Sequence, residues 1–516
     1  MKQTMKKYTI LLAGLLSAVL FTSCNDMLET TNYSDMSPVN FFTSEGDFDA
    51  AVTGLYAPCT TNWGYSDLGS GKWHNAIFCA DNNAHYAASM LSTDIVTPYS
   101  SGNATAEFTM GPSTGGPYSH TYNVIRFVAR ATDIIDNIQK STGSTREIRD
   151  RYVAEAKVLR AYYMWMLWDW FGPVSARLNP ESLYSTEFEA RPSNETYVQW
   201  MLNDIEDAIN CSALPVKYNG DESNWGRMSK SIAYAIRMRI YMHEKEWAKA
   251  KADAETIMGM GYSLVGNYED VFNNTMTSEH IWSIPSNTSS DDFYITEILP
   301  GDFWEGTFFG GDSYQRGDGS NNISGWQAYC MRWDFYDTFA DNDLRKKTII
   351  YEYKDKNGNV HDRSNGMVGA IPVKFTDSQF NEYGINKTGG TTKEHPVIRY
   401  AEILLAYAEA ENQLNGPTAN AIAAVKQITD RAGIEIPAEA KASKGAFDNF
   451  ILEESGRELY CEGHRRTDLI RHGEFIKRAQ ARGVTNAKDY MTLYPIPQTA
   501  ITEAGGIVEQ NPGYTN

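Results

Sequence analysis

The chain has 516 residues, of which 42% are hydrophobic and 22% charged, and these values fit a globular protein with a large buried core. The formal net charge is −19, so the surface lacks the basic footprint that nucleic-acid phosphates require, and we expect no nucleic-acid partner. An acidic surface of this kind suits a neutral ligand. The aromatic content of 12% is the unusual value in the composition.

The first residues have the pattern of a bacterial export signal. Lys6 and Lys7 precede an apolar run that ends at Phe21, which is of signal-peptide length and too short for a comfortable transmembrane helix. Small residues then lead to Cys24, as in a loose lipoprotein signal. We therefore expect residues 1–23 to be removed and Cys24 to carry the lipid that anchors the chain. An ordinary cleaved signal with an incidental Cys is the alternative.

The remaining cysteines are scattered, at Cys59, Cys79, Cys211, Cys330 and Cys461. This pattern has neither a disulfide framework nor metal-ligand spacing, although a Cys59–Cys79 bridge stays open in an exported protein. We predict no metal and no cofactor.

Helical signals begin after a polar, extended tether. A capping Ser44, acidic residues in the first turn and a stop at Pro58 predict the opening helix. A stretch rich in Gly, Ser, Thr, Asn and aromatics follows over residues 59–118 and is typical of long loops. Apolar periodicity then predicts a series of helices at Tyr122–Lys140, Arg146–Phe171, Asn194–Asn210, Lys230–His243 and Trp247–Gly259.

The helices after residue 122 favour a tetratricopeptide-like arrangement. The segment from Glu246 to Leu264 has closely spaced small residues, a Gly stop and a trailing Tyr, which let one helix pack tightly on the next. A further pair is predicted at Arg399–Leu414 and Thr418–Ala432. A generic helical bundle would use the same small residues, so it stays open as well.

Residues 266–395 interrupt this pattern with a long, aromatic, irregular insertion. Ile349–Tyr353 followed by Asn357-Gly358 predicts a strand and a hairpin turn. Long irregular insertions are usually functional or disordered, and the aromatic load argues against disorder. Flat rings among Gly, Asp, Asn and Arg form a natural platform for sugar rings, so Trp304 is a candidate ligand-binding residue. Most of the insertion's aromatics can instead pack onto the helices.

The segment Arg457–Phe475 is the most informative of the C-terminal region. A helix is predicted before it, Gly463 is expected to break that helix, and Thr467-Asp468 are placed to cap a short second helix that stops at Gly473. Its arginines are expected to face Glu453, Glu454, Glu458 and Glu462. We interpret Arg457, Glu458, Arg465, Arg466 and Asp468 as structural ion pairs; an anion-binding site is the alternative.

This segment, RELYCEGHRRTDLIRHGEF, closely resembles the C-terminal signature of the SusD/RagB family of outer-membrane lipoproteins of the Bacteroidota. Other stretches resemble the family in the same order: Phe41-Phe42 with the opening helix, a long aromatic helix ending at Gly172-Pro173, RYAEILLAYAEAENQLNG, and the tail YPIP with NPGY. The resemblance implies a mostly α-helical fold with tetratricopeptide-like pairs and a loop-rich, short-strand ligand-binding insertion. The resulting regions are residues 1–23, 24–43, 44–265, 266–395 and 396–516.

The resemblance also implies a function and a partner. We expect a lipid-anchored protein on the outer-membrane surface that captures a nutrient, most simply an oligosaccharide, for a SusC-like TonB-dependent transporter. Trp326 matches a tryptophan of the starch-binding members, and Tyr294 lies near a second aromatic. Tyr99 and Asn103 follow a stretch like the family's first binding loop, but the typical Trp is missing there. Trp73 and Asp81 are candidates on composition alone.

An enzyme is not predicted. Gly111–Gly115 matches the nucleophile-elbow pattern on paper, but it lies in a Gly-Pro loop without the strand and helix that this motif needs. Residues 355–359 lack the spaced ligands of a calcium loop. A surface glycoside hydrolase needs only two carboxylates, so it stays open as a rival. A tetratricopeptide-like interaction scaffold and a peptide binder are two further rivals.

Overall fold

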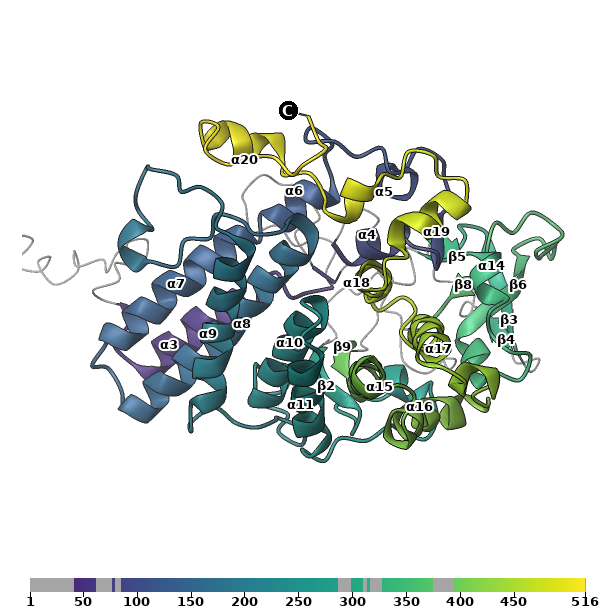
Figure 1. Ribbon diagram of the computed structural model, residues 1–516, viewed down its shortest axis with the longest axis horizontal. Coiled ribbons are helices and arrows are strands. Elements are labelled where there is room, and N and C mark those ends of the chain that lie inside the picture. Colours follow the sequence, from purple (N-terminus) through teal and green to yellow (C-terminus); the bar gives the residue numbers. More distant parts are fainter. Residues whose placement is uncertain are drawn as a thin grey trace, which may run out of the picture.

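The computed structural model describes residues 41–61, 77–78, 85–285, 298–309, 313–315, 327–374 and 394–515 (Figure 1). Its fold is mostly α-helical, as predicted. The longer helices are α3 (Glu45–Leu55), α7 (Ile125–Lys140), α8 (Arg146–Phe171), α9 (Asn194–Asn210), α10 (Lys230–His243), α11 (Trp247–Met258), α15 (Tyr400–Asn415), α16 (Ala419–Ala432) and α17 (Lys444–Glu458). Shorter ones include α4 (His85–Leu91), α5 (Ala104–Glu107), α6 (Pro117–Tyr122), α12 (Asp270–Asn273), α14 (Trp333–Tyr336), α18 (Arg465–Arg471), α19 (Phe475–Ala481) and α20 (Gln498–Glu503).

Local signals in the sequence account for where these helices begin and end. Ser44 accepts the backbone N–H of Asp47 and the Asp47 side chain accepts that of Ser44, which is a complete capping box at the start of α3. The Thr145 side chain accepts the backbone N–H of Ile148 and caps α8. Gly172, with φ +70°, ends α8 in a backbone conformation that residues with a Cβ avoid.

Neighbouring helices pack in succession. α7 packs on α8 and α8 on α9, while α10 packs on α11 and α15 on α16. α11 also packs on α15, although the whole insertion separates them in the sequence (Figure 1). Small buried residues such as Ala250, Ala254 and Ala408 allow this close approach. The helical series is therefore continuous in space across the insertion. None of the described helices combines the length and the apolar character that crossing a membrane requires.

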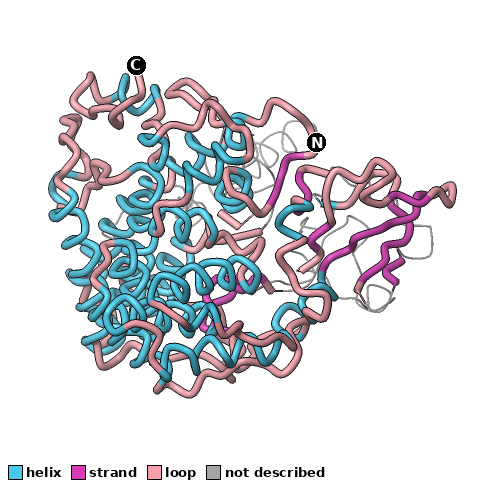
Figure 2. The backbone as a smooth tube through the Cα atoms, turned by 45° about the vertical axis from the view of Figure 1, so that its right-hand side comes forward, coloured by secondary structure: helices cyan, strands magenta, loops and turns pink. Residues whose placement is uncertain are grey.

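Most strands belong to the insertion and lie at one side of the helical body, whereas one pair lies among the helices (Figure 2). They are β1 (Val96–Pro98), β2 (His280–Ile284), β3 (Phe303–Phe308), β4 (Ser313–Gln315), β5 (Tyr329–Met331), β6 (Ile349–Asp355), β7 (Val360–His361), β8 (Ile371–Pro372) and β9 (His395–Arg399). β4, β3, β6 and β7 are neighbours in that order in one sheet, with β8 also paired to β6. The predicted strand and its hairpin are confirmed: β6 and β7 pair antiparallel around Asn357-Gly358, where Gly358 has φ +84°.

Two further strand pairs connect the insertion to the rest of the chain. β1 pairs antiparallel with β5, and β2 pairs antiparallel with β9. Because β2 enters the insertion and β9 leaves it, their pairing brings the two ends of the insertion together. These pairings join segments whose contact could not be predicted from the sequence alone.

Two local predictions need correction. The helix before the signature ends at Glu458, with Leu459 as its C-cap, and so stops ahead of Gly463. The next helix begins at Arg465 rather than at Thr467-Asp468. Asp468 is not an N-cap, because its carboxylate accepts from the Ser455 hydroxyl at 2.7 Å and from Arg471 at 2.7 Å. Cys59 is a buried free thiol, and its predicted possible partner Cys79 lies outside the described residues.

Candidate functional site

A buried network of ion pairs surrounds the end of α17. Glu458 accepts from Arg399 at 2.6 Å and from Arg431 at 2.5 Å, and Arg399 also donates two bonds to Glu462 at 2.6 and 2.8 Å. Arg457 pairs with the neighbouring Glu454 at 2.8 Å. Burial opposes the charged form of Glu462, but Arg399 and Lys374 outweigh it and lower the pKa of Glu462 to about 2. The opposite charges of these groups therefore keep one another ionised.

The partners of the signature arginines differ from those expected. Arg465 does contact Glu453, at 3.2 Å, but Arg466 pairs with Asp169 of α8 at 2.8 Å, and Arg471 pairs with Glu409 of α15 at 2.6 Å. The expectation that all of them face the glutamates of residues 453–462 is wrong, because arginines of a short helix reach whichever elements pack around it. The network ties the signature to α8, before the insertion, and to α15, after it.

Arg465 also reaches the loop that leads to the candidate ligand-binding residues. Its Nε and Nη2 each donate to one oxygen of Asp94 at 2.8 Å. Arg478 donates to the same carboxylate at 2.7 Å. These two arginines outweigh the effect of burial and keep the pKa of Asp94 well below its usual value. Asp94 is therefore a charged anchor just before β1.

Tyr99 follows β1 and is 46% exposed. Its backbone N–H donates to the carbonyl of Ala328 at 3.3 Å, which extends the β1–β5 pairing. The loop after β1 thus lies beside the segment that follows Trp326. An exposed tyrosine on a hydrogen-bonded backbone presents a ring at low conformational cost, which suits stacking on a ligand.

The other described candidates have distinct surroundings. The side-chain oxygen of Asn103 accepts the N–H of Ala106 at 3.0 Å and caps α5. Its NH2 group is the part of the side chain that can donate to a ligand. Trp304 is 37% exposed on β3, where a register shift interrupts pairing with β6. Such bulges redirect side chains and are common next to binding sites. The predicted residues Trp326, Tyr294, Trp73, Asp81 and Cys24 lie outside the described residues.

A stack of aromatic rings on the sheet of β3, β6 and β7 could not be identified from the sequence. Tyr353 stacks on Phe303 with ring centroids 5.6 Å apart and on His361 with centroids 4.6 Å apart. Its hydroxyl donates to Asp302 at 3.3 Å. Burial and the neighbouring Asp302 carboxylate raise the pKa of Tyr353. Period-2 alternation marks Tyr353 as inward-facing, but it does not identify the partners of its ring.

Two hollows in the described part of the chain are worth comparing as ligand sites. One is a cavity of about 100 Å³ between α8, α10 and α15, with Arg239, Glu402 and His464 among its lining residues. It is too small for a sugar chain, because ligand pockets usually measure about 300–1,000 Å³. The other is an open groove of about 1010 Å³ beside α17, with Phe450 and Arg457 among its lining residues. The groove is large enough to be a rival location for a ligand.

Comparison with known proteins gives two family matches. A model described as "SusD family" matches residues 346–514, and one described as "Starch-binding associating with outer membrane" matches residues 77–303. A SusD-like protein of Formosa agariphila is 27% identical over 92% of this chain and 93% of its own length. The starch-binding protein SusD of Bacteroides thetaiotaomicron is 22% identical over 73% of this chain and 75% of its own.

Solved structures share the fold. A laminarin-binding SusD-like protein has a TM-score of 0.72 at 20% identity and covers 92% of this chain and 100% of its own. Surface glycan-binding protein A from Bacteroides thetaiotaomicron, solved with laminarihexaose, has a TM-score of 0.70 at 20% identity and covers 91% of this chain and 100% of its own. Sequence models and architecture agree with the signature at residues 457–475, and the chain belongs to the SusD family.

Proposed function

We propose that this chain is a glycan-binding lipoprotein of the outer membrane and has no catalytic role. The observation that carries the proposal is the position of Tyr99, which is exposed and fixed by its backbone to the segment after Trp326. Two loops far apart in the sequence thereby contribute to one surface with aromatic rings, which suits the apolar faces of sugars. The relatives named for binding starch and laminarin support the same ligand class.

The ligand is proposed to be a neutral oligosaccharide. The chain carries a formal charge of −19, which disfavours acidic ligands, and the aromatic candidates Tyr99, Trp304 and Trp326 need no ligand charge. Asn103 can donate through its NH2 group to a sugar hydroxyl. We assign no single glycan.

Calorimetry of residues 25–516 against starch, laminarin and other polysaccharides tests this proposal. Removing one stacking ring from the site, in Tyr99→Ala or Trp326→Ala, should weaken binding by about 1–2 kcal/mol, or roughly 5- to 30-fold. Tyr184→Ala is the matched control, because Tyr184 is 80% exposed outside this surface. Phe450→Ala reports on the rival groove beside α17.

Each result of this experiment has a distinct meaning. Loss of binding in Tyr99→Ala with normal binding in Phe450→Ala supports the proposed surface. The reverse pattern would move the ligand to the groove. Release of reducing sugar in the same tubes would indicate a glycoside hydrolase instead. If no glycan binds, glycan recognition is abandoned and a peptide panel becomes the next test.

We further propose that Cys24 carries the lipid and that a SusC-like TonB-dependent transporter receives the ligand. The lipoprotein-like N-terminus and the family model described as associating with the outer membrane support this role. Cys24→Ser should abolish incorporation of labelled palmitate and release the chain from the membrane fraction. Co-purification of a transporter of this class with the wild-type chain, but not with unrelated lipoproteins, tests the partner.

A further inference from the structure

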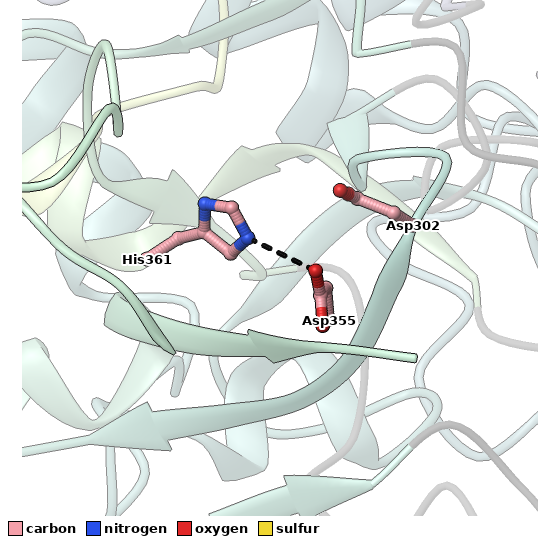
Figure 3. Close-up of side chains that lie close together, drawn as sticks. All are labelled: Asp302, Asp355 and His361. Atoms are coloured by element: carbon pink, nitrogen blue, oxygen red, sulfur yellow. Dashed lines mark hydrogen bonds and ion pairs between the residues drawn. The ribbon is translucent and has the colours of Figure 1, made fainter. Parts of the chain in front are cut away.

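Three side chains with metal-binding atoms converge at one end of the sheet that contains β3, β6 and β7 (Figure 3). Asp302 lies in the turn before β3, Asp355 ends β6 and His361 lies in β7. One ligand atom of each lies within 4.8 Å of the others. Because each residue belongs to a different segment, the pairing of the strands brings them together, and the cluster is not the product of one acidic loop.

The spacing of two of these groups fits coordination better than a direct hydrogen bond. His361 Nε2 and Asp355 Oδ2 are 3.5 Å apart, whereas a good N–H···O contact measures about 2.9 Å. Two ligands held at about 2.1 Å from a tetrahedral ion lie roughly 3.4 Å apart. The imidazole and the carboxylate are thus separated as two ligands of one ion would be.

The charges in the cluster also favour a cation. Asp302 and Asp355 bring two carboxylates together, and within the described ranges His361 is the only basic side chain that pairs with either of them. The nearby Lys354 pairs instead with Glu305 at 3.2 Å. A divalent cation placed between the two carboxylates would be attracted by both of their charges.

The three groups are held in place without any ligand. The imidazole of His361 stacks on Tyr353 at an interplanar angle of 13°, and the Tyr353 hydroxyl donates to Asp302. The Oδ1 atom of Asp355 accepts two backbone N–H groups, from Asn357 at 2.8 Å and Asn359 at 2.9 Å, and its Oδ2 atom accepts from the side-chain NH2 group of Asn359 at 2.7 Å. These contacts position the side chains in advance, which reduces the ordering cost of binding an ion.

We propose that Asp302, Asp355 and His361 form a binding site for a divalent transition-metal ion, with Zn²⁺ as the best chemical match. One neutral imidazole and two carboxylates suit Zn²⁺, and three protein ligands leave a fourth position open. Ca²⁺ takes six to eight oxygen ligands and does not match this set. Asp302 of this site lies two residues before the exposed Trp304, so the ion lies next to one of the aromatic residues assigned to the glycan surface.

Titration of the full chain with ZnCl₂ tests this site. The protein is purified in detergent without a histidine tag and freed of metal with a chelator, which is then removed. We expect one saturable Zn²⁺ site in the wild type. Asp302→Asn should weaken its affinity by at least about tenfold, while it keeps an acceptor for the Tyr353 hydroxyl and hence the fold. Glu305→Gln, which changes a carboxylate of the same sheet outside the cluster, should bind Zn²⁺ as the wild type does.

Thermal unfolding gives a second readout. Zn²⁺ should raise the Tm of the wild type and of Glu305→Gln, but not that of Asp302→Asn or His361→Gln. Equal Zn²⁺ affinity in these two ligand variants would place the ion elsewhere among the nine histidines of the chain and would overturn the proposal. The absence of saturable binding in the wild type would overturn it as well, and saturable Ca²⁺ binding at these residues would overturn the choice of metal.

Discussion

Arg465 binds Asp94 through two parallel contacts of 2.8 Å, although 371 positions separate the two residues in the sequence. Asp94 lies just before β1, and Tyr99 follows β1. The C-terminal signature therefore fixes the loop that carries the exposed tyrosine. Under the proposed function, the signature therefore contributes to binding by positioning Tyr99.

Removal of the Asp94 charge should disturb both stability and binding. Asp94→Asn removes the more buried of the two carboxylates that Arg465 and Arg478 share, the other being Glu453, and loss of one partner from a buried ion pair typically costs up to about 3 kcal/mol. We expect a lower Tm and weaker glycan binding, because the start of β1 loses its anchor. Thermal unfolding and calorimetry measure the two effects.

Asp430→Asn is the control for this variant. Asp430 pairs with Lys426 on the surface of α16, and both side chains are more than half exposed. Surface pairs of this kind contribute about 0–1 kcal/mol, so its Tm should change little. Equal losses in the two variants would show that the Asp94 contact has no special structural role.

Stability should fall as the pH drops below about 6.5, in part because of His395. Burial lowers the pKa of His395 to about 4, from an ordinary value of 6.5. Between these two values the unfolded chain binds a proton that the folded chain excludes, so acid favours unfolding there by up to about 1.4 kcal/mol per pH unit. His395→Gln should flatten the dependence of Tm on pH between 6.5 and 4. An unchanged slope would exclude His395 as its source.

His472 should have the opposite dependence. It lies 3.2 Å from both Glu409 and Asp448. Burial disfavours its charge, but these carboxylates prevail and raise the pKa of His472 to about 9 from 6.5. Its contribution to stability is complete below pH 6.5 and is lost as the pH rises towards 9. His472→Gln should lower the Tm at pH 6 more than at pH 9.5, and an equal loss at both pH values would contradict this assignment.

Gly306 should tolerate no side chain. A Cβ at this position would lie 2.7 Å from Ile350 Cδ1 and 2.9 Å from the ring of Phe303. Gly306→Ala should therefore cost about 1–3 kcal/mol and separate β3 from β6. Unfolding in denaturant measures the loss. Gly115→Ala is the control, because a Cβ there meets no atom within 4 Å; a similar loss in both variants would count against the close packing of β3 on β6.

The helices could be predicted because their signals are local. The capping box at Ser44 and the stop at Gly172 each act within one turn of backbone, and the structure confirms the helices that they delimit. The cap expected at Thr467-Asp468 is wrong, because the Asp468 carboxylate has a stronger partner in Arg471 than a backbone N–H. The residue type alone does not reveal which of several possible partners a carboxylate will bind.

The candidate site was harder to predict, because its members come from distant segments. The hairpin around Asn357-Gly358 follows from local residues, but the proximity of Asp355 to Asp302 depends on the β3–β6 register. Likewise, the loop at Tyr99 meets Ala328 only because β1 pairs with β5. Strand pairing between remote segments has no spacing rule, so the aromatic residues could be named while their arrangement could not.

The pairing of β2 with β9 has a consequence for how this protein can change over time. It closes the insertion at its base, and α11 packs directly on α15, so the helical series is continuous across the insertion. The entropy of closing a loop grows slowly, by about 0.6 kcal/mol for each doubling of its length. Loops within the insertion can therefore be lengthened or shortened at small thermodynamic cost, as long as its buried contacts with the frame, such as Arg345 with Glu454 and β5 with β1, are kept. New ligand preferences can then arise in these loops while the frame that holds them stays the same.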